Sequence, residues 1–239
     1  MKLLNGDCLK LMKDIPDGSV DLILCDPPYG TTVCKWDSVL PLDQLWAEYD
    51  RLLKPNGAAV LFAAQPFTTQ LIASNRKAFR YCWYWLKNQP TGFVYARYQP
   101  MRKIEDVCVF YRQMPTYNPQ GLERITNPKA KRKKRGRVDH IYKMGTLLNE
   151  HTPRFKNYPK NVLQFNTERG LHPTQKPVPL LEYLVKTYTN EGDTVLDNCM
   201  GSGSTGVAVK RVGGRRFIGI EQNQVYFEIA QKRIGETEK

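Results

Sequence analysis

The stretch TVLDNCMGSGSTG, residues 194–206, decides the fold. It passes from a short apolar strand into a glycine-rich turn and then into a helix expected near 205–211. A second strand at 216–220 follows and leads into Glu221, so strand, loop, helix and strand occupy about 30 residues. This is a βαβ unit. It predicts an α/β protein with a mostly parallel sheet and helices on both faces.

The glycines of this turn suit a ligand-binding loop. Gly201, Gly203 and Gly206 follow the spacing G-x-G-x-x-G, which lets a backbone turn sharply and approach a ligand closely at a helix N-terminus. Glu221 at the end of the next strand is placed to bind a ribose diol. The spacing alone does not separate NAD from another adenosine cofactor. The sequence lacks the G-x-x-x-x-G-K-[ST] pattern of a P-loop.

Further strands and helices are expected on both sides of this unit. Apolar runs at 20–25, 58–63 and 106–111 predict buried strands. Apolar residues at helical spacing predict helices over 43–53, 177–189 and 225–233. The chain therefore contains enough regular segments for one large α/β core.

A second motif follows the predicted strand 20–25. Asp26-Pro27-Pro28-Tyr29 leaves the sheet through two prolines, which cannot continue a strand and restrict the backbone. Asp26 and Tyr29 are thereby held at the carboxyl edge of the strand, where open α/β sheets bind ligands. The simpler alternative is a loop with an exposed acid and a packed tyrosine, but it leaves the second, glycine-rich motif without an explanation.

Composition sets the class of protein. The 239 residues are 41% hydrophobic and 25% charged, as in globular proteins, and they form one large domain or a core with an insertion. No apolar stretch approaches the ~20 residues of a membrane helix, and the N-terminus lacks a signal-peptide pattern, so we expect a cytoplasmic protein without a membrane partner. The six cysteines lack C-x-x-C spacing, which predicts reduced thiols and no metal site.

The positive charge is concentrated in one segment. The net charge is +13, and residues 97–160 hold 16 Lys or Arg against five Asp or Glu. This part also loses the strand–helix rhythm and contains the run Lys131-Arg132-Lys133-Lys134-Arg135. A charge so localised suits a polyanion, because neutralising phosphates releases counterions. A solvated loop that only aids solubility is the alternative.

Taken together, the motifs resemble those of a known family. Asp26-Pro27-Pro28-Tyr29, the glycine loop and His172-Pro173-Thr174-Gln175-Lys176-Pro177 resemble the amino-group DNA methyltransferases. The order of catalytic motif, basic insertion and cofactor loop resembles their circularly permuted β class. The resemblance implies a Rossmann-like S-adenosylmethionine-dependent fold. It predicts a catalytic half over 1–112, a target-recognition insertion over 113–170 and a cofactor-binding half over 171–239.

The resemblance also implies roles for individual residues. Asp26 and the Pro27 carbonyl would accept the hydrogens of a base amine, and Tyr29, held after Pro28, would stack on the flipped base. Trp83, Tyr84, Trp85 and Phe93 would form the opposite wall of the base pocket or belong to the core. His172 is not favoured as a base, because the amine loses its proton only after it becomes cationic. The implied cofactor residues are Asp7, Cys8, Asp26, Thr174, Lys176, Asp197, Asn198, Met200, Gly201, Gly203, Thr205, Glu221 and Gln222.

The expected partner is double-stranded DNA. The residues expected to bind its phosphates are Lys129, Lys131, Arg132, Lys133, Lys134, Arg135 and Arg137. Arg97, Arg102, Arg124 and Asn127 are candidates for reading base edges. A homodimer and a cognate restriction endonuclease are further partners that the resemblance implies.

The favoured function is transfer of a methyl group from S-adenosylmethionine to N6 of a flipped adenine. Cytosine N4 is the alternative target on the same scaffold, although Asp26 at the first motif position resembles the adenine enzymes. Cytosine C5 is excluded, because the sequence lacks the Pro-Cys dipeptide of a C5 nucleophile. A NAD-dependent oxidoreductase leaves Asp26-Pro27-Pro28-Tyr29 unexplained, and a non-catalytic DNA-binding module leaves the glycine loop unexplained.

Overall fold

A computed structural model describes residues 1–30, 38–127, 131–132, 150–168 and 175–238. Its centre is an eight-stranded sheet in the order β1-β12-β11-β2-β3-β5-β4-β10. These strands are β1 (Lys2–Asn5), β2 (Val20–Cys25), β3 (Leu53–Ala63), β4 (Phe79–Thr91), β5 (Arg102–Phe110), β10 (Val162–Phe165), β11 (Thr194–Asp197) and β12 (Arg216–Glu221).

Strand directions place one set of loops at a common edge. β5 is antiparallel to both of its neighbours, β3 and β4, while every other neighbouring pair in this sheet is parallel. The carboxyl ends of β2, β11 and β12 therefore meet at one edge, where Asp26 follows β2 and the glycine loop follows β11. The predicted mostly parallel α/β sheet is confirmed.

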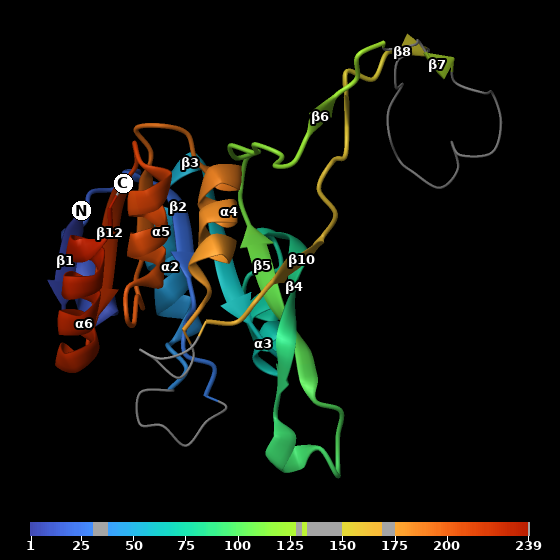
Figure 1. Cartoon of the computed structure of the whole chain (residues 1–239). Coiled ribbons are helices and arrows are strands. Elements are labelled where there is room, and N and C mark those ends of the chain that lie inside the picture. The colour runs from blue at the N-terminus through green and yellow to red at the C-terminus, as the bar shows by residue number, and fades with distance from the viewer. Residues whose placement is uncertain (31–37, 128–130, 133–149, 169–174, 239) are drawn as a thin grey trace. The chain divides into compact units, whose positions relative to one another are not determined.

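Helices cover both faces of the sheet, as Figure 1 shows. One core contains Leu22, Val60 and Trp83 from the sheet together with the apolar sides of α4, α5 and α6. The other contains Ile23 and Leu61 with α1, η1, α2 and α3. These helices are α1 (Cys8–Leu11), η1 (Met12–Asp14), α2 (Leu42–Leu52), α3 (Phe67–Ser74), α4 (Val178–Tyr188), α5 (Ser204–Val212) and α6 (Gln224–Glu236). Alternate residues of the central strands face opposite cores, which explains why those strands are apolar throughout.

The chain divides into two compact units, Met1–Asn118 with Asn161–Lys239, and Pro119–Lys160. The second unit holds 12 Lys or Arg against three Asp or Glu. In it, β6 (Glu123–Arg124) pairs with β9 (Phe155–Lys156), and β7 (Lys131–Arg132) pairs with β8 (Glu150–His151). This second unit, Pro119–Lys160, is shorter than the predicted insertion, 113–170. One reason is that β10 pairs with β4 and so belongs to the main sheet.

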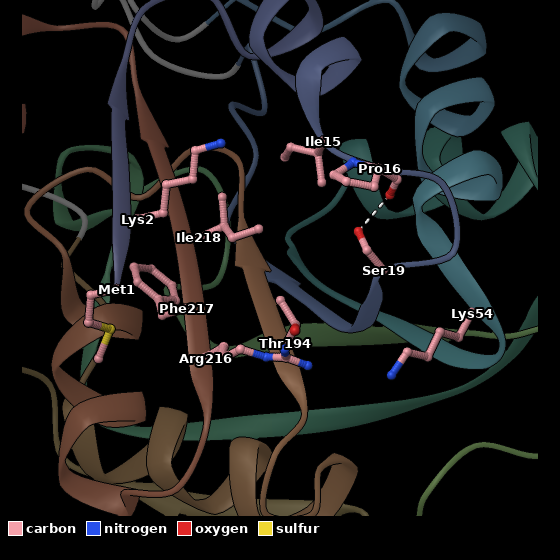
Figure 2. A pocket seen from close by; sticks show the side chains of 10 residues that line it. All are labelled: Met1, Lys2, Ile15, Pro16, Ser19, Lys54, Thr194, Arg216, Phe217 and Ile218. Atoms are coloured by element: carbon pink, nitrogen blue, oxygen red, sulfur yellow. Dashed lines mark hydrogen bonds between the residues drawn. The ribbon is translucent and has the colours of Figure 1, made fainter.

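A small hollow lies at the opposite edge of the sheet, where β1, β11 and β12 begin. Figure 2 shows Lys2, Thr194 and Arg216 around it, and its volume is about 470 Å³. Lys54 on its rim is paired with Asp21 at 2.7 Å. The hollow is remote from the carboxyl edge that carries both motifs.

Among the described residues, no helix is long and apolar enough to cross a membrane.

Candidate active site

A large cavity joins the two motifs at the carboxyl edge of the sheet. Its volume is about 1340 Å³, and Asp26 and Tyr29 line it together with Asp197, Gly201 and Glu221. Residues from β4 and β5 complete the wall beside Asp26, whereas the glycine loop and the start of α6 form the other end. One continuous cavity therefore contains the D-P-P-Y motif and the glycine loop at its two ends, which we call the catalytic end and the cofactor end after the roles that the sequence predicts.

The D-P-P-Y motif places a carboxylate and a ring in the catalytic end. Pro27 is buried, and the Tyr29 hydroxyl donates to Asp26 Oδ1 at 2.5 Å. The Tyr29 ring stacks on Phe67, with centroids 5.2 Å apart and planes 21° apart. Lys176 Nζ donates to the second oxygen of Asp26. Both oxygens of the carboxylate are therefore oriented by neighbouring side chains.

Asp26 belongs to a row of alternating charges. Lys176 Nζ lies 3.6 Å from Glu105 Oε2, and Lys87 Nζ donates to Glu105 Oε1 at 3.0 Å. The Lys87 side chain is only 2% exposed and that of Lys176 only 8%. Within the described chain, Glu105 Oε2 is buried and accepts no hydrogen bond. Two acids and two lysines thus balance each other in a largely buried cluster.

The electrostatics of the row favour the charged form of Lys176. Burial acts to lower the pKa of Lys176, but the carboxylates of Asp26 and Glu105 outweigh it and raise that pKa. Burial also acts to raise the pKa of Glu105, and the two lysines more than reverse the effect. For Asp26, burial dominates and raises the pKa, against the opposing influence of Lys176 and Tyr29.

The cofactor end has a sharply turned backbone. Gly201 and Gly203 have φ values of +51° and +80°, a region that L side chains rarely adopt. Gly206 serves packing instead, because a Cβ there would lie 2.3 Å from Ile234 Cδ1. The three glycines of the motif therefore have two roles, turning the loop and bringing α5 close to α6.

Glu221 is fixed by backbone amides. Gly201 N donates to its Oε2 at 2.9 Å, and Asn223 N donates to its Oε1 at 2.8 Å. The carboxylate lines the cavity and retains acceptor capacity, since each oxygen accepts more than one hydrogen bond. This arrangement fits the diol of a ribose.

Asp197 ends β11 at the floor of the cavity. It is 3% exposed, and its Oδ1 accepts from Cys199 N at 3.1 Å. Burial raises the pKa of Asp197 to about 7, because the surroundings stabilise its charge too little. A cationic group bound beside it would restore the ionised form.

The structure brings most of the predicted site residues together. Those that line the cavity are Cys8, Asp26, Pro27, Pro28, Tyr29, Lys176, Asp197, Asn198, Met200, Gly201, Thr205, Glu221 and Gln222. Gly203 shapes the loop without lining the cavity. Asp7 does not line it either: its side chain caps α1 by accepting from Leu9 N at 2.9 Å, while Gly6 and Cys8 beside it do line the wall.

Several predicted site residues lie outside the part of the chain that the structure describes. Thr174 and His172 lie outside the described residues, as do Lys129, Lys133, Lys134, Arg135 and Arg137. For Lys131 and Arg132 the structure describes only the backbone, in β7. The phosphate-binding role of this set stays a prediction.

The structure adds residues to the site to which the sequence had assigned no role. Glu105 and Lys87 come from β5 and β4, and their roles appear only when these strands pair. The sequence offered no clear signal for them, because these strands contain other charged residues, among them Arg80, Arg102 and Asp106. Trp83 and Trp85 are both buried on one face of β4, but of the two only Trp85 lines the cavity.

Comparison with known proteins identifies the family. The sequence matches the family N6_N4_Mtase, described as DNA methylase, over residues 20–232. It is 30% identical over 251 residues to the DNA adenine methyltransferase YhdJ of Escherichia coli, covering 97% of this chain and 82% of that protein. It is 29% identical over 252 residues to the type II methyltransferase M.HpaI of Haemophilus parainfluenzae, covering 98% and 74%.

Solved structures agree with this result. The crystal structure of the M1.HpyAVI–SAM complex superimposes with a TM-score of 0.66 at 26% identity, covering 98% of each chain. The cytosine-N4-specific PvuII DNA methyltransferase has the same fold, with a TM-score of 0.68 at 16% identity over 97% of this chain and 85% of that one. With a family match across nearly the whole α/β core and both motifs on one cavity, this chain belongs to the N6_N4_Mtase family of DNA methylases.

Proposed function

We propose that this chain transfers the methyl group of S-adenosylmethionine to the exocyclic N6 of adenine in duplex DNA. The observation that carries the proposal is the single cavity with Asp26 and Tyr29 at one end and the glycine loop with Glu221 at the other. The adenine specificity is supported by the name of the E. coli relative and by the aspartate in the first position of the D-P-P-Y motif.

The residues of the cofactor end fit S-adenosylmethionine. Glu221 would accept the ribose hydroxyls, and Asp197 would face the ammonium of the methionine part. The cavity has room for both a nucleoside and a flipped base, since sites for drug-sized ligands occupy about 300–1,000 Å³. When bound, this cofactor supplies an electrophilic methyl group on a sulfonium.

At the catalytic end, Asp26 activates the amine of the base. The amine is a poor nucleophile, because its lone pair is delocalised into the ring. Asp26 and the Pro27 carbonyl would each accept one amine hydrogen, which favours a pyramidal nitrogen with its lone pair free. Lys176 and Tyr29 hold the carboxylate in place for this task. Positioning and electrostatics carry such a transfer without a covalent intermediate.

The nature of the product tests the proposal directly. Purified protein is incubated with S-adenosylmethionine and unmodified genomic DNA, which is then digested for mass spectrometry of the nucleosides. We expect N6-methyladenine. N4-methylcytosine would keep the mechanism and replace the target base. Neither product, from protein that binds the cofactor in calorimetry, would contradict methylation of DNA by this chain alone.

Glu105 shares Lys176 with Asp26. Lys176 lies between two carboxylates, so an amine arriving at Asp26 competes with a lysine that has a second partner 3.6 Å away. In Glu105→Gln the second partner is neutral, and Lys176 binds Asp26 more tightly. We expect kcat to fall about tenfold, which corresponds to ~1.4 kcal/mol, with an unchanged Kd for S-adenosylmethionine.

A double variant separates this role from simple stability. Glu105→Gln with Lys87→Gln removes one charge of each sign, so the melting temperature should recover while kcat stays low. Asp106→Asn is the matched control, because Asp106 is the next residue of β5 and bonds Thr68 at 2.6 Å instead of the lysines. Recovery of kcat together with stability would mean that Glu105 only supports the fold.

A cognate restriction endonuclease and a homodimer complete the proposal. The type II names of M.HpaI and of M2.DpnII from Streptococcus pneumoniae support the endonuclease. Endonuclease protection of DNA methylated by this chain tests the first partner, and sedimentation velocity tests the second.

A further inference from the structure

The hairpin between β4 and β5 has an exposed apolar tip. We define the hairpin tip as residues 93–98, which begin with the short helix η2 (Phe93–Tyr95). The exposed fractions are 80% for Phe93, 82% for Val94, 60% for Tyr95 and 87% for Tyr98. Ala96 N donates to Phe93 O at 3.0 Å, so the backbone is folded although the large side chains face solvent. Figure 1 shows the hairpin extending beyond the neighbouring strands.

The exposed side chains of this tip bury little apolar area against the rest of the protein. Exposed clusters of large apolar side chains mark interaction sites, whereas single exposed ones are ordinary. The charge around the cluster indicates its partner: Arg97, Arg102 and Lys103 are exposed, and residues 88–104 contain no Asp or Glu. Aromatic rings among cations suit nucleic acid, because bases stack on the rings and phosphates bind the cations.

The tip rises from the catalytic end of the cavity. Lys87 and Thr91 of β4 and Arg102 and Glu105 of β5 line the cavity beside Asp26. These are the same two strands that carry the tip. A base that reaches Asp26 from duplex DNA therefore leaves its stack close to this hairpin, and its departure opens a gap between the neighbouring base pairs.

We propose that the hairpin tip enters duplex DNA at the target base pair and fills the space that the flipped base leaves. Its aromatic rings stack on the bases that lose their neighbour, and Arg97 binds an adjacent phosphate. Filling the gap offsets part of the cost of unstacking, as apolar wedges do in proteins that kink DNA. The inference rests on the proposed function, since it assumes that a base is drawn into the cavity.

The test compares an intact with a weakened target pair. The methylated position is first mapped in genomic DNA, and a short duplex is made with the target adenine opposite thymine or opposite a mismatched cytosine. The triple variant Phe93→Ala, Tyr95→Ala, Tyr98→Ala should methylate the matched duplex about 10- to 100-fold more slowly than wild type. On the mismatched duplex it should stay within about threefold, because a mismatched base flips at lower cost.

Controls distinguish the remaining outcomes. Met114→Ala removes another side chain that is 75% exposed and should leave both rates unchanged. An equal loss on both duplexes, or no loss on either, would overturn the proposal, as would a change in sedimentation showing that the tip joins two copies of the chain. If wild type methylates no position in genomic DNA, the proposed function fails and no target duplex can be designed. Anisotropy with a labelled duplex of arbitrary sequence then tests the tip alone, and equal binding by wild type and triple variant would overturn a DNA-binding tip.

Discussion

Asp26→Asn is expected to lower the methylation rate by about 10³-fold while leaving the Kd for S-adenosylmethionine within about threefold. The Asp26 carboxylate has two acceptor oxygens, whereas the asparagine amide has one oxygen and an NH2 group that only donates. The amide NH2 would repel the hydrogens of the base amine. Losses of 10²–10³-fold are typical when one preorganised electrostatic contact to a transition state is removed. Rates are measured by nucleoside mass spectrometry, and cofactor affinity by calorimetry.

The same variant also affects stability, so a control must separate the two effects. Lys176 is 8% exposed, and among the described residues Glu105 is the anionic partner that it keeps after the change. Breaking a buried pair costs about 3–5 kcal/mol when one charge is left uncompensated, and the remaining carboxylate reduces that cost here. Asp26→Asn with Lys176→Met should therefore regain stability without regaining activity.

Asp21 provides a matched control on β2, the strand that Asp26 follows. It pairs with Lys54 at 2.7 Å and accepts from Thr194 N at 2.9 Å, outside the large cavity. Asp21→Asn should lower the melting temperature and keep kcat. If Asp26→Asn retained turnover at the wild-type rate, the carboxylate would not be the group that activates the amine.

The affinity for S-adenosylmethionine is expected to weaken by about tenfold for each pH unit below 7. Burial raises the pKa of Asp197 to about 7, so below that pH the unliganded protein holds a proton on this carboxyl. The ammonium of S-adenosylmethionine binds the ionised carboxylate of Asp197. At lower pH this carboxyl must lose its proton before the cofactor binds, and the cost of that step weakens the affinity. Above pH ~8 the affinity should fall again, because the ligand's own α-amino group loses its charge.

Asp197→Asn tests the assignment. The variant should bind S-adenosylmethionine about 100-fold more weakly at pH 7, since truncating one partner of a buried charge pair costs about 2–5 kcal/mol. Its Kd should also be independent of pH between 5.5 and 7. Calorimetry in two buffers of different ionisation enthalpy counts the protons released by wild type at pH 6. Release of no proton there would show that Asp197 is not the titrating group.

Asp197 makes the stability of the unliganded protein fall as the pH rises, which is the opposite of the effect of a salt-bridged aspartate. Unfolded Asp197 titrates near 3.9, whereas the folded group titrates near 7. Its contribution to stability is therefore complete below pH ~4 and is lost as the pH rises to 7. Bound cofactor should remove this loss, so the melting temperature should gain more from S-adenosylmethionine at pH 7.5 than at pH 5.5.

Local sequence patterns predicted most of the core correctly. The apolar run 20–25 coincides with β2, and the periodic segment 177–189 contains α4, Val178–Tyr188. Both are buried elements whose periodicity reflects the side that packs, so pattern and structure agree. The prediction for β3 was too short: the strand begins at Leu53, within a turn-like Lys-Pro-Asn-Gly sequence, because the pairing of Leu53 with Val20 extends it.

By itself, the sequence determined the α/β class, the two motifs and the edge of the sheet where they meet, because each depends on residues within one short segment. Only the tertiary structure decided that Lys176 contacts Asp26, that Glu105 and Lys87 continue the row of charges, and that residues 93–98 stand exposed beside the cavity. Lys176 and Asp26 are 150 positions apart. Contacts over such separations depend on the order and register of strands in the sheet, which no local periodicity encodes.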